Sequence, residues 1–376
     1  MTKYLTVFVD GHSFDTGWQG TTTYLTGILN ELPGAMARCA PEVKLRLVCS
    51  AEKEENIRQH VTTPFEFVSI RGGFLRRNGF DIPRALCKTG ADLVVSQYVR
   101  PFFAPCQTLS VIHDVLFLDL LQSFSWKYRL SRYVMFGWSA RHSSLVSSVS
   151  TYSAERIEAH FGVSANSIPI IPNAVDLSFL AAERQPWAAG TPLRLISVSR
   201  LERRKRHEWG IAAQEALACA GFESELTIIG GGDGPYAEDL RAEVEAAQNR
   251  GLNVMIRSSL PFSELVEAYA RSHIFIFPAE AEGFGIPVIE AAGAGIPGVV
   301  SDGGALADFE GHFVGELFPA ADKQAFIDAV LRVAENLDEF REMAEVARQQ
   351  VGKTYSWRNA ANNYAEIFKT IAESKP

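Results

Sequence analysis

Short apolar runs alternate with longer amphipathic stretches along almost the whole chain, and this alternation limits the possible folds more than any other feature. Continuous apolar runs of this length are typical of strands that are buried on both faces of a parallel sheet. The runs are YLTVFV, KLRLVC, DLVVSQ, TLSVIHD, LRLISVS, ELTIIG, HIFIFP and GVVSD, and NVMIRS is a further predicted strand. Stretches such as HEWGIAAQEALACA and AEDLRAEVEAAQNR lie between them and have helical periodicity. The pattern predicts an α/β fold of parallel sheets covered by helices.

The chain of 376 residues is longer than one hydrophobic core usually supports, so we expect two domains. A segment rich in Pro, Ala and Gly, residues 172–191, separates two strand–helix series and is the expected linker. The two series predict Rossmann-like domains over 1–172 and 173–357 that face each other across a cleft. Ligands bind such domains at the carboxyl ends of their strands.

Composition excludes several classes of protein. No apolar run approaches the length of about 20 residues that a membrane-spanning helix needs, and the first residues do not form a signal peptide, so we expect a cytoplasmic protein. The five cysteines form no CxxC pair or zinc spacing. A net charge of −8 without a recognised binding motif argues against a nucleic-acid partner.

The stretch EAEGFGIPVIEAAGAGIP follows a predicted strand and places Glu282 and Glu290 with seven residues between them. Pro287 suits the first turn of a helix, so Glu282 is expected in the preceding loop and Glu290 about one turn inside. The glycines allow close approach to the backbone, and a helix start favours anionic oxygens. The two carboxylates therefore suit a ligand with both hydroxyls and phosphates. A helix whose glutamates only complement the helix dipole is the alternative.

A second motif, SRLERRKRHEWG, follows the first strand of the second domain and contains Arg200 and Lys205. Cations at the carboxyl end of a strand can stabilise a diphosphate. We expect the neighbouring Arg203, Arg204 and Arg206 to be solvated charges. GGDGPY follows the next strand, and a single Gly-rich turn of this kind is weak evidence.

Together these motifs resemble the retaining glycosyltransferases of family 4, whose GT-B fold has two Rossmann-like domains. The resemblance covers nearly the whole chain, and its most specific part is the E-x7-E pattern. The motifs are SRLERRK, GGDGP, PAEAEGFGIPVIEAAGAGIP and SDGG, with GTTTY, VIHD, VSTYSAERI and IPNAVD in the first half. The resemblance also implies that the last helix crosses back to the first domain as a hinge. That domain then comprises 1–172 plus about 358–376.

The resemblance implies a role for each matching position. Arg200 and Lys205 would hold the diphosphate of a nucleotide sugar. Glu282 would contact hydroxyls of the donor sugar, and Glu290 the ribose. His113 would lie beside the donor sugar at the reaction centre, with a packing histidine as the alternative. The other donor-binding positions are the backbone of Gly283, Phe284 and Gly285, the base-contacting Ser258, Ser259 and Leu260, and the loop glycines Gly17 and Gly20.

Some positions depart from the family pattern, but none of the changes removes a charge that the chemistry needs. They are Thr22, Ala279, Ala174, Ser258 and Arg206, the last of which replaces a glycine.

A departing nucleoside diphosphate gains negative charge, which preorganised positive groups stabilise. No two Asp residues are spaced i, i+2 as a metal-binding DxD pair requires, so Arg200 and Lys205 are the expected cations. We predict a metal-independent reaction. Retention and front-face attack are implied by the resemblance alone, with Glu282 positioning the sugar rather than forming a covalent bond.

One further sequence pattern lies in the predicted first domain, where the acceptor of the sugar is expected to bind. No acidic residue lies between Asp119 and Glu155, although this span is basic and aromatic, and 71–84 adds a second basic cluster. Segments 120–154 and 71–84 suit a membrane interface or a lipid-linked acceptor, while a helix packed on the sheet with a solvated loop is the alternative.

We therefore predict a glycosyltransferase that moves a hexose from a UDP- or GDP-sugar to a glycan or lipid-linked acceptor in surface polysaccharide or glycolipid synthesis. A non-hydrolysing nucleotide-sugar epimerase and a non-catalytic nucleotide-sugar-binding subunit are the alternatives.

Overall fold

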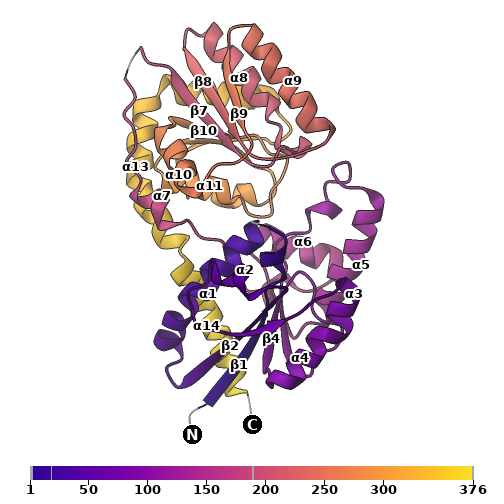
Figure 1. Ribbon diagram of the computed structural model, residues 1–376. Coiled ribbons are helices and arrows are strands. Elements are labelled where there is room, and N and C mark those ends of the chain that lie inside the picture. The colour runs from indigo at the N-terminus through magenta and orange to yellow at the C-terminus, as the bar shows by residue number, and fades with distance from the viewer. Residues whose placement is uncertain (1–2, 18, 189, 375–376) are drawn as a thin grey trace. The chain divides into compact units, whose positions relative to one another are not determined.

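The computed structural model describes residues 3–17, 19–188 and 190–374. The chain divides into two compact units. The first contains the residues up to Ala174 together with those from Ser356 onwards, and the second spans Val175–Tyr355. Each unit has one parallel sheet with helices on both faces (Figure 1). The predicted α/β class with two Rossmann-like units is confirmed.

The sheet of the first unit has the order β3-β2-β1-β4-β5-β6. Its strands are β1 (Lys3–Asp10), β2 (Val43–Ala51), β3 (Glu66–Ser69), β4 (Leu93–Gln97), β5 (Gln107–Val111) and β6 (Leu145–Ser147). Its helices are η1 (His12–Asp15), α1 (Gly20–Cys39), α2 (Glu54–Arg58), α3 (Phe74–Arg76), the π-helix η2 (Arg77–Asp81), α4 (Ile82–Thr89), η3 (Leu116–Leu118), α5 (Trp126–His142), α6 (Thr151–Phe161), η4 (Ala165–Ser167) and α14 (Trp357–Glu373).

The sheet of the second unit has the order β12-β11-β10-β7-β8-β9. Its strands are β7 (Leu193–Val198), β8 (Ser224–Ile229), β9 (Asn253–Arg257), β10 (Ile274–Phe277), β11 (Gly298–Ser301) and β12 (Gly315–Phe318). Its helices are α7 (Leu177–Ala181), η5 (Arg203–Lys205), α8 (Glu208–Cys219), α9 (Pro235–Asn249), α10 (Phe262–Arg271), α11 (Ile286–Gly293), η6 (Ala305–Phe309), α12 (Lys323–Glu335) and α13 (Leu337–Thr354).

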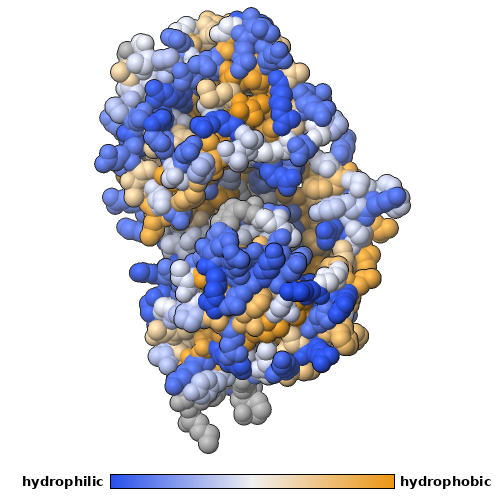
Figure 2. Space-filling view, in the orientation of Figure 1, coloured by the Kyte–Doolittle hydropathy of each residue, from blue (hydrophilic) through white to orange (hydrophobic). Residues whose placement is uncertain are grey.

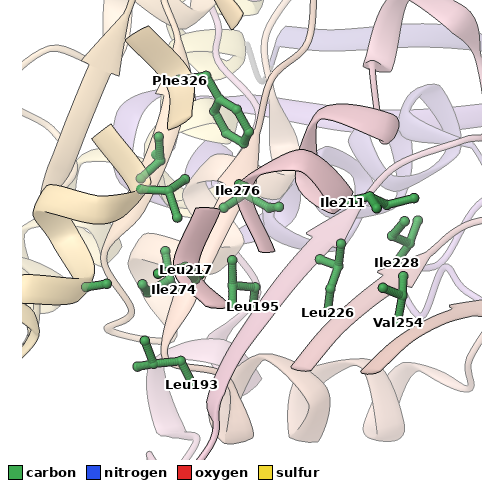
Figure 3. Close-up of a cluster of buried hydrophobic side chains, with 14 of the residues drawn as sticks. Leu193, Leu195, Ile211, Leu217, Leu226, Ile228, Val254, Ile274, Ile276 and Phe326 are labelled. Carbon is green, nitrogen blue, oxygen red and sulfur yellow. The ribbon is translucent and has the colours of Figure 1, made fainter. Parts of the chain in front are cut away.

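The core of the second unit lies between this sheet and its helices. Leu195, Leu226 and Ile276 come from three adjacent central strands and are at most 1% exposed. Figure 3 shows them gathered with Ile211 of α8. Burial of apolar area stabilises such a core at about 25 cal/mol per Å². This core fixes the strand ends from which the site loops leave.

The last helix, α14, packs on α1 in the first unit, in agreement with the predicted return of the chain. The Ser356 side chain caps α14 by accepting a hydrogen bond from the Asn359 amide. The Tyr24 hydroxyl of α1 lies 3.0 Å from the Tyr364 hydroxyl of α14. A Cβ on Gly27 would stand only 2.1 Å from the ring of Trp357, so a glycine is needed at this contact.

Candidate donor-sugar site

The loop after β7 places the predicted catalytic residue Lys205 beside a second one, Glu282, which lies in the loop after β10. Lys205 lies in η5 and is buried, with 7% of its surface exposed. Its ammonium group contacts the carboxylate of Glu282 and lies 5.2 Å from the centre of the Phe277 ring. A buried ammonium needs such a partner, because an isolated charge is strongly disfavoured away from water. Lys205 and Glu282 therefore form one buried charge cluster.

Arg200 lies in the same loop but faces solvent. Its side chain is 74% exposed, and its Nε lies 3.3 Å from Glu202 Oε1. An exposed ion pair of this kind contributes little to stability, so its guanidinium can turn towards another anion at low cost.

The expectation that Arg203, Arg204 and Arg206 are solvated charges is wrong for two of them. Arg203 is exposed. Arg204 is largely buried, with its Nη1 3.3 Å from Glu282 Oε1 and also 3.3 Å from the Ala281 carbonyl oxygen. The loop after β10 approaches η5 closely enough to take this guanidinium out of solvent. Glu282 therefore contacts two cations, Lys205 and Arg204.

Arg206 is anchored rather than solvated. Its φ is +51°, in the left-handed region, where glycine fits without steric cost. Its guanidinium donates to the Ala320 carbonyl and lies 4.8 Å from the centre of the Trp209 ring. This backbone geometry explains physically why glycine suits the position after Lys205.

Glycines of the SDGG motif hold the backbone of Glu282. The Glu282 amide donates to the Gly303 carbonyl at 3.2 Å, and its own carbonyl accepts from the Ala305 amide at 2.9 Å. A Cβ on Gly303 would lie 2.1 Å from the Glu280 carbonyl oxygen, and one on Gly304 would lie 2.5 Å from that of Glu282. Only glycines allow these two loops to pack this closely, and the packing fixes the position of Glu282.

Glu290 lies one turn inside α11, as the sequence predicted. Gly285, with φ of +108°, caps the helix, and Pro287 stands in its first turn. The Tyr269 hydroxyl donates to Glu290 Oε2 at 3.0 Å. Burial raises the pKa of Glu290 to about 7, although the hydrogen bond from Tyr269 acts in the opposite direction. This carboxyl is therefore poised to change protonation near neutral pH.

The side chain of Phe284 points into the unit, so only its backbone can face a ligand. Its ring packs edge-on against Phe309 and Tyr355, with centroid distances of 5.4 and 6.0 Å. A Cβ on Gly285 would lie 2.7 Å from a methyl group of Leu306. Gly283 is also buried. These contacts fix the start of α11 relative to η6.

The Gly-rich turn between β8 and α9 has a definite packing role. A Cβ on Gly230 would lie 1.8 Å from the Ser199 carbonyl oxygen, and one on Gly232 would lie 2.8 Å from that of Leu201. The Leu201 amide also donates to the Gly231 carbonyl at 3.0 Å. The turn therefore supports the loop that carries Arg200.

The predicted base-contacting residues lie in the loop between β9 and α10. Ser258 and Ser259 are exposed, and Leu260 is partly buried. The Gly230 amide donates to the Arg257 carbonyl at 2.8 Å, which ties the start of this loop to the Gly-rich turn. These side chains are accessible at the carboxyl end of the second sheet, where the loop with Arg200 and Lys205 also lies.

His113 follows β5 in the first unit and is 7% exposed. Its Nε2 lies 2.6 Å from Gln97 Oε1, at the end of β4, and the Tyr24 ring meets it edge-on at 5.0 Å. Burial lowers the pKa of His113 to about 3, so the imidazole is neutral at physiological pH. The carboxyl end of the first sheet therefore presents a neutral, hydrogen-bonded imidazole.

Gly17 and Gly20 flank the start of α1. Gly17 has φ of +84°, and Gly20 is the first residue of the helix. Thr22, which stands where a second glycine is common, places its hydroxyl 3.3 Å from the Ser13 carbonyl oxygen and 3.4 Å from that of Gly17. The threonine therefore holds the loop to the helix.

Sequence reasoning missed Arg204 and His207. Nothing in RRKR distinguishes the arginine that turns inward from its neighbours. The sequence pattern predicts only that His207 belongs to the helical stretch HEWGIAAQEALACA, but it is 2% exposed and contacts both serines of ISVSR, Ser197 and Ser199. The available signal for His207 was its position, since it follows a cationic loop and stands at the start of a predicted helix.

Two family models and a solved structure identify the class of protein to which this chain is similar. The model for "Glycosyltransferase Family 4" matches residues 34–179, and that for "Glycosyl transferases group 1" matches residues 181–350. The solved structure of HepE from Anabaena, in complex with UDP and glucose, superposes with a TM-score of 0.73 over 97% of this chain and 100% of that chain, at 16% identity. This likeness shows the fold, which is GT-B.

Among curated relatives, a D-inositol 3-phosphate glycosyltransferase of Corynebacterium urealyticum is 30% identical over 51% of this chain and 47% of its own. A GDP-mannose-dependent alpha-(1-6)-phosphatidylinositol monomannoside mannosyltransferase of Mycolicibacterium smegmatis is 26% identical over 62% and 64%. The chain thus matches only about a quarter to two thirds of the length of the first such relatives. The two family models together span most of the chain, so this protein belongs to the family 4 (group 1) glycosyltransferases. The predicted family is confirmed.

Among the described residues, no helix is both long and apolar enough to span a bilayer. Within the same ranges, no three His, Cys, Asp or Glu side chains gather in a way that could hold a metal ion.

Proposed function

We propose that this protein is a retaining, metal-independent glycosyltransferase. It transfers a hexose from a UDP- or GDP-sugar to a glycan or lipid-linked acceptor, in the synthesis of a surface polysaccharide or glycolipid on the cytoplasmic side of the membrane. The observation that carries the proposal is the cluster of Lys205, Arg204 and Glu282 beside the start of α11.

The cations of this cluster suit a departing diphosphate. Lys205 and Arg204 are held in place by neighbouring loops, and Arg200 is exposed, so its guanidinium can turn towards a second phosphate oxygen. Fixed positive charge at a leaving group lowers the barrier because it needs no reorganisation during the reaction. This arrangement supports a reaction in which protein cations take the place of a metal ion.

Glu282 acts by positioning the transferred sugar. Its carboxylate contacts two cationic neighbours, and a carboxylate accepts hydrogen bonds from sugar hydroxyls. The same neighbours reduce its nucleophilicity, which favours positioning over covalent attack. Glu290 accepts from the ribose, and the neutral imidazole of His113 contacts the donor sugar. In front-face attack, the donor phosphate accepts the proton of the acceptor hydroxyl.

Helix α5 supports a lipid-linked acceptor. Trp126, Leu130 and Val134 recur every four residues along one face and are 66%, 56% and 59% exposed. Hydrophobic colour appears in Figure 2 along the side of the first unit where α5 runs. Lys127 and Arg132 add positive charge to the same helix. Exposed apolar residues beside cations are typical of binding to an anionic lipid surface.

The first test is thermal shift with UDP, GDP, ADP and dTDP, each with and without EDTA. We expect one nucleotide to stabilise the protein selectively and EDTA to leave the shift unchanged. Stabilisation by no nucleotide, or only with a metal ion, would contradict the proposed donor site.

Turnover distinguishes the transferase from its alternatives. With the selected nucleotide sugar, Glu282→Gln is expected to lower transfer by about 100-fold or more while nucleotide binding is kept. Glu267→Gln, which changes an exposed carboxylate on α10, serves as the control. An altered sugar formed without acceptor would indicate an epimerase, and normal binding without turnover in the unaltered protein would indicate a binding subunit.

Sedimentation with vesicles tests the α5 surface. Trp126→Ser combined with Leu130→Ser is expected to weaken binding to anionic vesicles by about ten-fold or more, because about 100–200 Å² of apolar contact is lost per large side chain. Val346→Ser on α13 removes an apolar residue of the second unit that is 81% exposed, and it is expected to have no effect. Equal binding by all three proteins would contradict a membrane role for α5.

A further inference from the structure

His207 is a buried histidine for which the proposed chemistry has no direct use. It stands just after Lys205 and Arg206, at the start of α8, and is 2% exposed. Its ring turns back across the loop towards residues that precede the cations. Nδ1 lies 3.2 Å from the Ser197 hydroxyl, and Nε2 lies 3.0 Å from the Ser199 hydroxyl. Nε2 is also 3.3 Å from the Arg200 carbonyl oxygen.

These contacts identify which ring nitrogen carries the proton. A carbonyl oxygen can only accept, so Nε2 donates to Arg200 and Nδ1 accepts from the Ser197 hydroxyl. The ring is neutral, because burial and the nearby Lys205 together lower the pKa of His207 to about 4, although the hydrogen bond to the Arg200 carbonyl acts in the opposite direction. A neutral ring supplies one donor, which the Arg200 carbonyl accepts, and one acceptor, to which the Ser197 hydroxyl donates.

The backbone of His207 is fixed as well. Its amide donates to the Tyr236 hydroxyl at 2.9 Å, and that hydroxyl donates to Glu208 Oε2 at 2.6 Å. Arg206, immediately before it, has the left-handed φ that closes the loop. The ring is thus attached to a rigid helix start, and it holds the Arg200 carbonyl from that anchor.

The histidine therefore joins the two ends of the cation-bearing loop. The loop leaves β7 at Ser199 and reaches α8 at His207, with Arg200 and Lys205 between them. On its other side the same loop rests on the Gly-rich turn, where Gly230 and Gly232 permit close contact. Without the histidine, the Arg200 carbonyl loses one of two hydrogen bonds, the other being from the Glu202 amide at 2.9 Å.

We propose that His207 is a positioning residue that holds the Ser199–Lys205 loop in the conformation that binds the diphosphate of a nucleotide, without contacting the ligand itself. This inference rests on the proposed function. It predicts that His207 governs recognition of the diphosphate and leaves recognition of the nucleoside unchanged, because the base and ribose are held by other loops.

Another histidine of the same unit provides a matched control. His273 is 1% exposed, and burial lowers its pKa to about 4. Its Nδ1 accepts from the Arg194 amide at 3.1 Å. It precedes β10 and contacts the start of β7, so it lies at the amino-terminal edge of the sheet, whereas His207 lies at the carboxyl edge. His207→Ala and His273→Ala remove similar buried rings from opposite edges.

The experiment compares calorimetric affinities for the nucleoside diphosphate selected by thermal shift and for its nucleoside. His207→Ala is expected to weaken diphosphate binding by about ten-fold or more and to leave nucleoside binding within about two-fold. His207→Gln keeps an amide donor near the position of Nε2 and is expected to recover most of the loss. If the alanine variant does not fold, His207→Leu replaces it, because leucine fills most of the buried volume but has no donor for the Arg200 carbonyl, and the same loss is expected. His273→Ala is expected to change neither affinity.

Each outcome decides the question. Equal weakening for diphosphate and nucleoside, the same loss in His273→Ala, or unchanged binding in both His207 variants would overturn the positioning role. If the unaltered protein binds no nucleotide, the proposed function itself fails and this inference fails with it. Nucleotide binding by the unaltered protein that is insensitive to His207 removes the inference alone.

Discussion

At the scale of single residues, Glu290 is a buried group whose charge changes near neutral pH. Burial raises its pKa to about 7, above the value of 4.5 expected in solvent. The folded protein therefore holds this proton more tightly than the unfolded chain does. The resulting stability is fully present below pH about 4.5 and is lost as pH rises through about 7. The loss is at most about 3 kcal/mol.

The same carboxyl predicts pH-dependent nucleotide binding. Ribose hydroxyls donate hydrogen bonds to the ionised form, so we expect affinity to rise several-fold between about pH 6 and pH 8, with release of a proton. Calorimetry in buffers of different ionisation enthalpy measures that proton. Glu290→Gln is expected to abolish both effects, and Tyr269→Phe to shift them to higher pH because its hydrogen bond lowers the pKa. A proton release that persists in Glu290→Gln would assign it to another group.

At the scale of elements, the contact between α1 and α14 depends on a missing side chain. Gly27→Ala would place a methyl group 2.1 Å from the Trp357 ring, and backbone or ring must move to relieve the clash. We expect a loss of about 1–3 kcal/mol in the free energy of unfolding, as overpacking usually costs. Chemical denaturation followed at several wavelengths measures this change.

Gly34→Ala is the control within the same helix. Gly34 is exposed, and its new Cβ would meet only the flexible end of Arg38, at 3.1 Å. Alanine is a better helix former, so we expect a gain of about 0.5–1 kcal/mol. Loss of stability in both variants would place the sensitivity in α1 itself rather than in its contact with α14.

At the scale of the whole molecule, the two units have separate hydrophobic cores. Phe368 of α14 and Phe326 of α12 are at most 2% exposed and belong to different units. Truncation of a buried phenylalanine costs about 3–5 kcal/mol. We expect Phe368→Ala to speed amide hydrogen exchange mainly in the first unit, and Phe326→Ala mainly in the second. Mass spectrometry of the exchanged peptides measures both, and equal acceleration throughout the chain would show one cooperative unit instead.

The sequence predicted the central strands better than the edges of the sheets. The strands β1, β4 and β7 were predicted because strands covered on both faces read as unbroken apolar runs. The missed strands, β3, β6 and β12, are all edge strands of only three or four residues. Runs of three or four residues are too short to show a strand pattern, so these sequences do not differ from those of loops. Pairing with a neighbouring strand, which no local pattern records, makes them strands.

In the site, the E-x7-E spacing and Pro287 placed Glu282 before the helix and Glu290 one turn inside it, because helix starts have local signals. The roles predicted for these residues stay proposals. The inward turn of Arg204 has no such signal, since neighbouring residues of RRKR have the same charge and similar length.

The sequence alone thus determined the alternating α/β pattern, the two series of strands, the glycines that tight loops need, and the supply of charges. These depend on residue type and on spacing within a few residues. Only the tertiary structure decided which charges meet. Strands β7 and β10 are adjacent in the sheet although they lie far apart in the chain, so their following loops converge and Glu282 reaches both Lys205 and Arg204. Strand order decides which of these side chains meet. A local sequence pattern does not contain this information, because strand order arises from the packing of the whole unit.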